Sequence, residues 1–399
     1  TKVETTTAKD GSTSKTTTNP NGSSVTENKA ADGSTGTVKT DKNGQTYLDF
    51  TSGIGVCNFG YSNEQITDNV FEQATKIWHT SNLYQSQLTE DVAGLLAGPD
   101  KLAFFCNSGT EANEAAMKFA RKTTGRSKMV TFHNSFHGRT YGAMSLTGNG
   151  AIKVGYAPLV PDVTFGDYNS NSALSLIDDQ TAGVILEVVQ GEGGVINGKP
   201  DWLTKVQTAC HQAGALLIID EVQTGIGRTG KKFAYQHYNL NPDVVTVAKG
   251  IGNGLPLGAM LGKKKFAATF GPGSQGTTFG GNKLSLAAAK GVLQQLTPSF
   301  LAMVDEKAAS VWNYLNEKID TLPAVESISG LGLMIGVHLS PVVDVNDVIT
   351  QLQAKDLLTL SAKHNTLRLL PPLVMTEHDL KKGLDMITDV LESAVTTTA

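Results

Sequence analysis

One lysine, Lys249, stands where a reactive amine would be presented to a ligand. It follows the apolar run 244–248 and precedes the glycine-rich segment 250–254. An amine at the end of a buried strand is partly removed from water, and a desolvated lysine is the group with which enzymes form imines with carbonyl compounds. Lys249 is therefore a candidate covalent anchor. The alternative is an ordinary solvated surface lysine.

A second candidate is Asp220, which directly follows the apolar run 215–219 and begins the motif Asp-Glu-Val-Gln. A carboxylate at the end of a buried strand is costly unless a cation or strong hydrogen-bond donors face it. A protonated pyridine nitrogen is one suitable partner. Asp220 is therefore a candidate for holding a pyridine-type cofactor.

The same region allows a different class of protein. An apolar run followed by Asp-Glu is also typical of a nucleotidase magnesium site, and segment 225–232 nearly matches a P-loop. However, Lys232 stands where a metal-binding Ser or Thr is required, and the glycine-rich segment follows the Asp-Glu strand itself. A phosphate-binding nucleotidase therefore remains only a distant alternative.

The exit of the apolar run 102–106 has the pattern of a phosphate cradle. Ser108 and Glu111 have the spacing of a capping box, and Gly109 leaves the backbone amides at the start of the following helical pattern open to an anion. Two loops add further candidates. Phe136, His137 and Arg139 offer a ring for stacking, an imidazole and a guanidinium, and segment 276–282 carries two hydroxyls. Each motif alone also fits an ordinary helix cap or surface loop.

The elements that must position these residues alternate between strands and helices. Continuous apolar runs separated by helical patterns predict a largely parallel sheet that is covered on both faces, and ligands of such sheets bind beyond the carboxyl ends of the strands. Longer helices predict a second, smaller α+β domain. The predicted strands are 102–106, 129–132, 184–189, 215–219, 244–247 and 333–339, and the predicted helices are 110–122, 202–213, 284–296, 301–319 and 378–395.

Composition restricts the partners. The 33 Lys and Arg residues against 37 Asp and Glu residues give a net charge of -4, which favours neither nucleic acid nor an anionic membrane. No apolar run reaches the length of about 20 residues that a membrane helix requires. The three cysteines are scattered without metal-ligand spacing, which fits a reducing cytoplasm and argues against a zinc site. We expect a cytoplasmic protein that acts on small molecules and binds no metal.

The amino-terminal region has a different composition. Residues 1–46 contain no Leu, Ile, Met, Phe, Tyr or Trp and are rich in Thr, Ser, Lys, Asn and Gly. Such a segment buries too little apolar surface to offset the entropy of ordering, so we expect residues 1–35 to be disordered or loosely attached. Segments 37–40 and 46–50 flank Asn43-Gly44 and predict a hairpin, with which order begins.

The motifs, taken together, resemble those of a known family. Their order is similar to that of the class III aminotransferases, pyridoxal-phosphate enzymes of fold type I, and the resemblance extends from about residue 36 to about residue 395. It implies a large domain (61–284) with a mostly parallel, seven-stranded sheet and a small domain formed by 36–60 and 285–399. The motifs that carry the resemblance are 108–110, 136–139, 190–194, 220–223, Lys249 and 276–278.

The resemblance also implies roles in binding pyridoxal phosphate. Lys249 would hold the cofactor as an imine and then act as the base that moves a proton, Asp220 would pair with the pyridine N–H, and Phe136 would stack on the ring. Gln223 would bond the phenolic oxygen, and Thr278 would reach the phosphate of a neighbouring subunit, so that the enzyme is a homodimer. The remaining implied cofactor contacts are Ser108, Gly109, Thr110, Glu221 and Val222.

For the substrate, the resemblance points to the enzymes that move the δ-amino group of N-acetylornithine to 2-oxoglutarate, in arginine biosynthesis. Arg139 would hold a distant carboxylate, Arg368 would hold the carboxylate next to the reacting amine, and Glu192 would act as a switch that pairs with Arg368 in one half-reaction only. Thr277 would complete the substrate site. Ornithine, 4-aminobutyrate and succinyl-diaminopimelate remain alternative amine donors, because small changes in a pocket shift preference by only about 1–3 kcal/mol.

Overall fold

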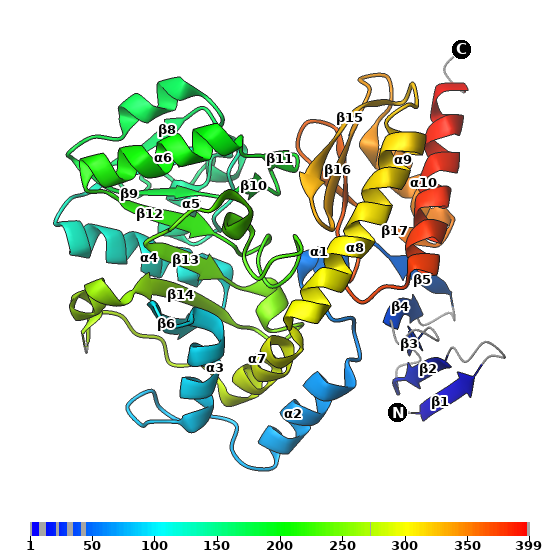
Figure 1. Cartoon of the computed structure of the whole chain (residues 1–399), viewed down its shortest axis with the longest axis horizontal. Helices are drawn as coiled ribbons and strands as arrows, with labels where there is room; N and C mark the ends of the chain where they lie inside the picture. The colour runs from blue at the N-terminus through cyan, green and yellow to red at the C-terminus, as the bar shows by residue number, and fades with distance from the viewer. Residues whose placement is uncertain are drawn as a thin grey trace.

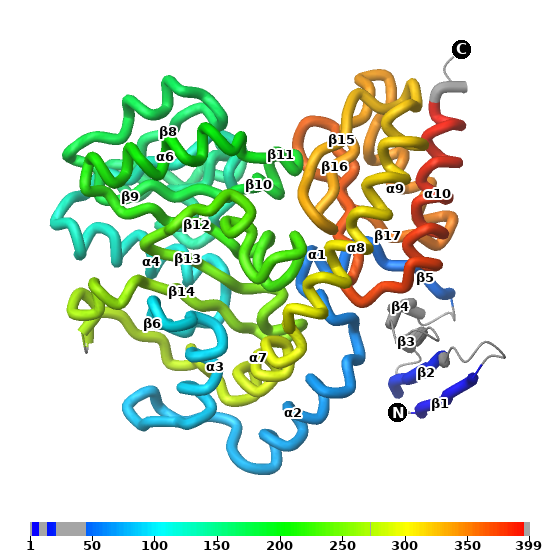
Figure 2. Tube along the Cα trace, in the orientation of Figure 1, coloured from blue at the N-terminus to red at the C-terminus, as the bar shows by residue number. Residues whose placement is uncertain are grey.

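A computed structural model describes residues 2–7, 13–20, 24–29, 35–40, 45–271 and 273–396. Most of this part of the chain forms two bodies, which lie on the left and on the right of Figure 1. The first is built around a seven-stranded sheet and the second around a four-stranded sheet. The continuous trace in Figure 2 shows that residues from both ends of the chain meet in the second body.

The large sheet is parallel except for one strand. Strand β14 is antiparallel to both of its neighbours, β13 and β6, whereas the other pairs are parallel. The prediction of a mostly parallel seven-stranded sheet is therefore confirmed. The strand order is β6 (Lys101–Cys106), β14 (Gly258–Lys263), β13 (Val244–Val247), β12 (Leu216–Asp220), β9 (Thr181–Leu186), β7 (Lys128–Phe132) and β8 (Val163–Gly166).

Both faces of this sheet are buried, because successive residues of a strand point to opposite sides. In β12, Ile218 packs in a cluster with residues of α4 (Gly109–Thr124), whereas Leu217 and Ile219 pack with residues of α6 (Pro200–Ala213). The strands are therefore fixed in register, and the carboxyl ends of all of them except β14 lie at a common edge.

Observed element bounds mostly follow the sequence patterns. Strand β13 has the predicted bounds, whereas β9 begins three residues before the predicted strand and ends before Glu187. Strand β14 was not among the predicted strands. The short helix α1 (Ser52–Gly55) follows β5, and the other helices of the large body are α2 (Glu64–Ala74), α3 (Gln87–Ala97), α5 (Tyr141–Leu146) and α7 (Lys283–Gln295).

The small body combines an antiparallel sheet with three helices (Figure 1). Its core is one large apolar cluster that includes Phe50, Leu315 and Leu369. Helix α7, at the predicted boundary, instead packs with the core of the large sheet. The strands are β15 (Val325–Leu331), β16 (Met334–Leu339), β19 (Thr366–Leu369) and β18 (Leu360–Ala362), and the helices are α8 (Pro298–Tyr314), α9 (Val345–Ala354) and α10 (Glu377–Thr396).

The amino-terminal residues form strands in the places where disorder was predicted. Four strands continue the small body through β5 (Thr46–Asp49), which pairs with β17 (Leu357–Leu358). The pairing of β4 with β5 confirms the two arms of the predicted hairpin, whereas its turn at 41–44 lies outside the described residues. The added strands are β1 (Lys2–Thr7), β2 (Thr13–Thr18), β3 (Ser24–Lys29) and β4 (Thr35–Thr40).

Local chemistry explains this correction. Threonine is β-branched and fits an extended strand, and Asx-Gly pairs favour tight hairpin turns. Such pairs recur at 10–11, 21–22, 32–33 and 43–44, and the strands begin at residues 2, 13, 24, 35 and 46, each eleven residues after the last. Backbone pairing joins the described strands β1 to β4 although their composition offers little apolar surface to bury. None of the described helices is both long and apolar enough to span a membrane.

Candidate active site

A cavity of about 470 Å³ opens beyond the carboxyl ends of the large sheet. It collects residues that are far apart in the sequence, from the start of α4, the loop after β7, the end of β12 and the end of β13. The predicted site residues that line it are Ser108, Gly109, Thr110, Phe136, Arg139, Glu192, Asp220, Val222, Gln223 and Lys249.

The amino terminus of α4 forms one end of the cavity. Ser108 caps the helix, since its side chain accepts a hydrogen bond from Glu111 N at 3.3 Å, as the capping pattern predicts. The carboxylate of Glu111 reaches back to Asn107 N rather than to the Ser108 backbone. A Cβ on Gly109 would lie 2.8 Å from Val222, so only glycine fits there. The open amides and the helix dipole form an anion-binding end.

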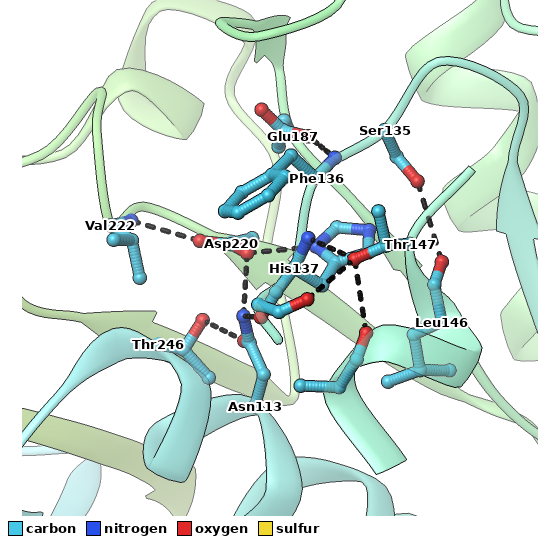
Figure 3. Close-up of polar contacts among 12 residues, drawn as sticks. Asn113, Ser135, Phe136, His137, Leu146, Thr147, Glu187, Asp220, Val222 and Thr246 are labelled. Carbon is cyan, nitrogen blue, oxygen red and sulfur yellow. Dashed lines mark hydrogen bonds and ion pairs between the residues drawn. The ribbon is translucent and has the colours of Figure 1, made fainter. Parts of the chain in front are cut away.

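Asp220 lies at the floor of the cavity with its carboxylate fully oriented (Figure 3). Oδ1 accepts a hydrogen bond from Val222 N at 3.0 Å, and Oδ2 accepts one from Asn113 Nδ2 at 2.8 Å. Oδ2 also contacts His137 Nδ1 at 2.8 Å. The side chain is only 3% exposed. Both carboxylate oxygens are therefore held in place by hydrogen bonds.

The imidazole of His137 is buried and contacts Asp220 through one ring nitrogen. Its Nδ1 faces the Asp220 carboxylate, whereas its buried Nε2 has no hydrogen-bond partner among the described residues. The ring is therefore oriented by Asp220.

Lys249 occupies a strained position just beyond β13. Its backbone φ is 50°, in the left-handed region that non-glycine residues rarely adopt and that often marks functional sites. Burial lowers the pKa of Lys249 to about 8, a shift that Glu192 opposes and Arg368 reinforces. Its side chain lines the cavity. At neutral pH, a larger fraction of Lys249 than of a surface lysine is therefore the neutral, nucleophilic amine.

An ion pair lies on the side of the small body. Arg368 Nη1 is 2.5 Å from Glu192 Oε1 and donates a longer bond of 3.4 Å to Gln223 Oε1. The arginine side chain is 4% exposed and the glutamate side chain 37% exposed. Burial opposes ionisation of Glu192, but the attraction and hydrogen bonding of Arg368 outweigh it and lower the pKa of the glutamate. Both groups are charged, and Glu192 has the freer side chain.

Arg139 lies across the cavity on an exposed loop, with its guanidinium carbon 6.0 Å from the centre of the Phe136 ring. The loop is anchored from below by Glu187, whose carboxylate accepts bonds from Phe136 N at 2.9 Å and Gly191 N at 3.0 Å. Burial raises the pKa of Glu187 to about 7, and repulsion by Asp220 contributes.

Four predicted site residues lie outside the cavity lining. Glu221 turns away from it, because its carboxylate accepts bonds from Thr224 Oγ1, Ala234 N and Tyr235 N. Arg368 is paired with Glu192, which lines the cavity in its place. Thr277 bonds Asn107 Nδ2 at 3.0 Å, and Thr278 is exposed in the single chain.

Sequence patterns assigned no role to two polar side chains that the structure brings to the site, Asn113 and Glu187. The signal for Asn113 was its position on the apolar face of a helix, between Ala112 and Ala116. A buried amide there requires partners. For segment 225–232, the structure has turns instead of the strand, loop and helix of a P-loop.

The family model of the class III aminotransferases matches residues 22–391. The chain belongs to this family. An acetylornithine aminotransferase of Lactiplantibacillus plantarum is 58% identical over 353 residues, which cover 88% of this chain and 91% of the relative.

Solved structures of class III aminotransferases agree with this assignment. N-acetylornithine aminotransferase from Stenotrophomonas maltophilia is 31% identical, with a TM-score of 0.79 over 91% of this chain and 95% of that chain. Ornithine aminotransferase from Toxoplasma gondii is 27% identical, with a TM-score of 0.86 over 90% of this chain and 89% of that chain, and its structure has partial occupancy of pyridoxal phosphate at the active site.

The cavity of this class III aminotransferase fits the same cofactor. Pyridoxal phosphate has an aldehyde, a basic ring nitrogen and a phosphate, and the cavity offers an amine at Lys249, an oriented carboxylate at Asp220 and a helix amino terminus at Gly109. The three groups come from the ends of β13, β12 and β6. One cavity therefore brings together the three chemical functions that the cofactor requires.

Proposed function

We propose that this class III aminotransferase moves the δ-amino group of N-acetylornithine to 2-oxoglutarate, with pyridoxal phosphate as cofactor. The products are N-acetylglutamate semialdehyde and glutamate, and the reaction belongs to arginine biosynthesis. The identity of 58% to an acetylornithine aminotransferase supports the choice of substrate. The single observation that carries the proposal is the ion pair of Glu192 and Arg368 beside Lys249.

The ion pair of Glu192 and Arg368 allows one site to bind two substrates whose carboxylates lie at different distances from the reacting amine. The reacting amine of N-acetylornithine is remote from its carboxylate, whereas that of glutamate is adjacent to one. An arginine left unpaired beside an uncharged carbon chain would be costly. Glu192 neutralises Arg368 while N-acetylornithine is bound, and it swings away when the α-carboxylate of glutamate arrives. Arg139 then holds the distant carboxylate in either half-reaction, with Thr277 at the edge of the site.

The cofactor supplies an electron sink for the carbon that loses its proton. Lys249 holds and releases the cofactor and transfers that proton, which its lowered pKa of about 8 favours near neutral pH. Asp220 bonds the ring N–H and Phe136 stacks on the ring. The remaining cofactor contacts that we propose are Ser108, Gly109, Thr110, Val222 and Gln223, all of which line the cavity.

We place the active enzyme as a homodimer in the cytoplasm, in which Thr278 of one subunit reaches the phosphate in the other. An exposed apolar surface supports this assembly. The large side chains Trp78, Leu83, Tyr84 and Phe279 are 64%, 90%, 72% and 61% exposed, and such a patch marks an interaction site. All three cysteines are buried and none forms a disulfide within the described residues, which is compatible with a reducing compartment.

We also propose the domain limits 36–60 and 285–399 for the small domain and 61–284 for the large one. The contacts of α7 with the large sheet favour moving the second limit to the start of α8.

The decisive experiment is a single half-reaction followed at the absorbance of the bound cofactor. Purified protein with pyridoxal phosphate is mixed with N-acetylornithine, and loss of the imine band is expected at a higher kcat/KM than with ornithine, 4-aminobutyrate or succinyl-diaminopimelate. If one of these amines gave the higher value, the substrate assignment would be wrong. A protein without an imine band, or whose band survives Lys249→Ala, would overturn the cofactor as well.

A further inference from the structure

Asn113 has a buried side-chain amide, and both its nitrogen and its oxygen form hydrogen bonds. It lies on α4, is 1% exposed, and directs Nδ2 to two acceptors, Asp220 Oδ2 at 2.8 Å and His137 O at 2.7 Å. Its Oδ1 accepts the hydroxyl of Thr246 at 2.7 Å. Figure 3 shows these side chains between α4 and the sheet. A fully satisfied polar group of this kind has one favourable orientation.

Sheet register explains why Asn113 reaches both strands. Thr246 is the direct partner of Asp220 in the parallel pairing of β12 with β13, so both side chains point toward α4. The hydroxyl of Thr246 sets the amide orientation, since a flipped amide would turn its oxygen toward the Asp220 carboxylate and the His137 carbonyl. Thr246 is also three residues before Lys249 on the same strand exit.

The charged groups around Asp220 explain why the Asn113 amide is important as a hydrogen-bond donor. The acids Glu187 and Glu221 both interact electrostatically with Asp220, and so does Lys249. Among the described residues, His137 alone forms an ion-pair contact with Asp220. The other hydrogen-bond donors to the carboxylate are the Asn113 amide and the Val222 backbone N–H.

We propose that Asn113 is a positioning residue that holds Asp220 oriented for the cofactor ring nitrogen, and that Thr246 fixes Asn113 for this task. The inference rests on the proposed binding of pyridoxal phosphate. Asn113 lies at the lining of the cavity beside Asp220 and acts through its hydrogen bond to that carboxylate. Its removal takes one donor from Asp220 Oδ2, so that the carboxylate is held less firmly toward a ring N–H.

Three variants separate this role from simple packing. Asn113→Leu has similar volume and removes the donor, Thr246→Val removes the group that orients it, and Asn113→Asp replaces the donor with an acid. Thr181→Val is the control, because Thr181 is an equally buried strand threonine whose hydroxyl bonds Asp178, away from the cavity. The first readout is the Kd for pyridoxal phosphate, measured by titrating the cofactor-free protein, with its thermal unfolding measured in parallel.

We expect Asn113→Leu to raise the Kd about 10- to 100-fold, corresponding to loss of a charge-assisted hydrogen bond, and Thr246→Val to raise it by a smaller factor of about 3 to 10. Thr181→Val should leave the Kd unchanged. A Kd within about twofold of the wild-type value for both Asn113→Leu and Thr246→Val would overturn the proposal. If Asn113→Leu does not fold, Thr246→Val and Asn113→Asp still decide it.

Asn113→Asp supplies a signature that packing alone does not produce. Two adjacent carboxyl groups share a proton at lower pH, and the protonated Asp then donates to Asp220 as the amide does. We expect its Kd, divided by the wild-type Kd at the same pH, to be near one at about pH 6 and above about 10 at pH 8.5. A ratio that is independent of pH would overturn the proposal.

The outcomes also distinguish this inference from the proposed function. A wild-type protein that binds no pyridoxal phosphate would overturn both. One that binds the cofactor but prefers another amine would overturn only the proposed substrate. Normal cofactor binding by the wild type and by all variants would overturn only the role of Asn113.

Discussion

Arg368 and Glu192 are 176 positions apart in the sequence and meet at 2.5 Å, where the sheet of the small body faces the cavity of the large one. Arg368 comes from β19, which is fixed between β16 and β18. Glu192 comes from the short segment after β10 (Val189–Gln190) and is the more exposed partner. The arginine is thus the more firmly held partner, and we propose that the glutamate is the group that moves.

Substitution of Glu192 should affect the two half-reactions unequally. In Glu192→Ala, Arg368 stays unpaired when N-acetylornithine is bound, so we expect kcat/KM for that amine to fall about 10- to 100-fold, while glutamate is affected less. Rapid-mixing absorbance measurements of each half-reaction test this. Glu192→Gln, which keeps an acceptor without the charge, should give an intermediate result. Equal losses with both amines would refute the switch.

Lys249 should destabilise the cofactor-free protein. Its folded-state pKa of about 8 lies below the ordinary value of 10.5, so the unfolded chain binds the extra proton and the penalty is present below pH 8. Stability from this group is recovered as pH rises from about 8 to 10.5. We expect Lys249→Met to increase the free energy of unfolding by about 1–2 kcal/mol at pH 7. Urea unfolding at pH 7 and pH 10 checks both the increase and its decline.

Gly138 should tolerate no side chain. It has a φ of 134°, and a Cβ would lie 2.2 Å from Thr110 Oγ1. Gly138→Ala is expected to cost about 3 kcal/mol or more, from backbone strain and overpacking together. Gly155→Ala is the matched control, because Gly155 also has a positive φ of 85° but nothing within 4 Å, so that only the strain of about 1–2 kcal/mol applies. Similar losses of unfolding free energy in both variants would contradict the packing argument.

We expect Glu114 to influence substrate binding although it does not line the cavity. Its Oε1 accepts bonds from Thr140 Oγ1 at 2.6 Å, Gly142 N at 2.8 Å and Ala143 N at 3.0 Å, which fixes the loop that carries Arg139. Loss of such a cap costs about 0.5–2 kcal/mol. We expect Glu114→Ala to raise KM for 2-oxoglutarate about 3- to 10-fold with a smaller change in kcat. Steady-state kinetics decide this, and Glu114→Gln should restore part of the loss.

Leu83 should be needed for assembly. A charge on this side chain, which is 90% exposed in the single chain, would be buried by a partner. Leu83→Lys is therefore expected to weaken a dimer at least about 10-fold. Sedimentation of the purified proteins at a series of concentrations measures the effect. Val342→Lys, on a surface that is 66% exposed, is the control; an equal effect of both variants, or a wild-type monomer, would count against this interface.

The sequence predicts the large sheet and the residues at its edge well, because each candidate follows an apolar run and parallel strands bring their ends together. Lys249, Asp220 and Gly109 are found at one cavity for that reason. The roles of Asn113 and Thr246 were not predictable, since each depends on a partner more than 100 residues away. Strand β14 was missed because its sequence, Gly-Ala-Met-Leu-Gly-Lys, holds only a three-residue apolar run between two glycines.

The amino-terminal strands were missed for a different reason. A prediction from hydrophobicity follows the apolar surface that a segment can bury. The described strands β1 to β4 are instead joined by backbone pairing. Periodicity in Asx-Gly pairs was the informative signal there, and a search for repeats would have found it.

The even spacing of these strands has a consequence for how the chain length can vary. Because β1 to β5 each start eleven residues after the preceding strand, successive strands present equivalent positions in the same order. We expect a deletion of eleven residues to leave the remaining strands in a matching register, whereas deletion of a single residue within a strand would turn the side chains beyond it to the opposite face.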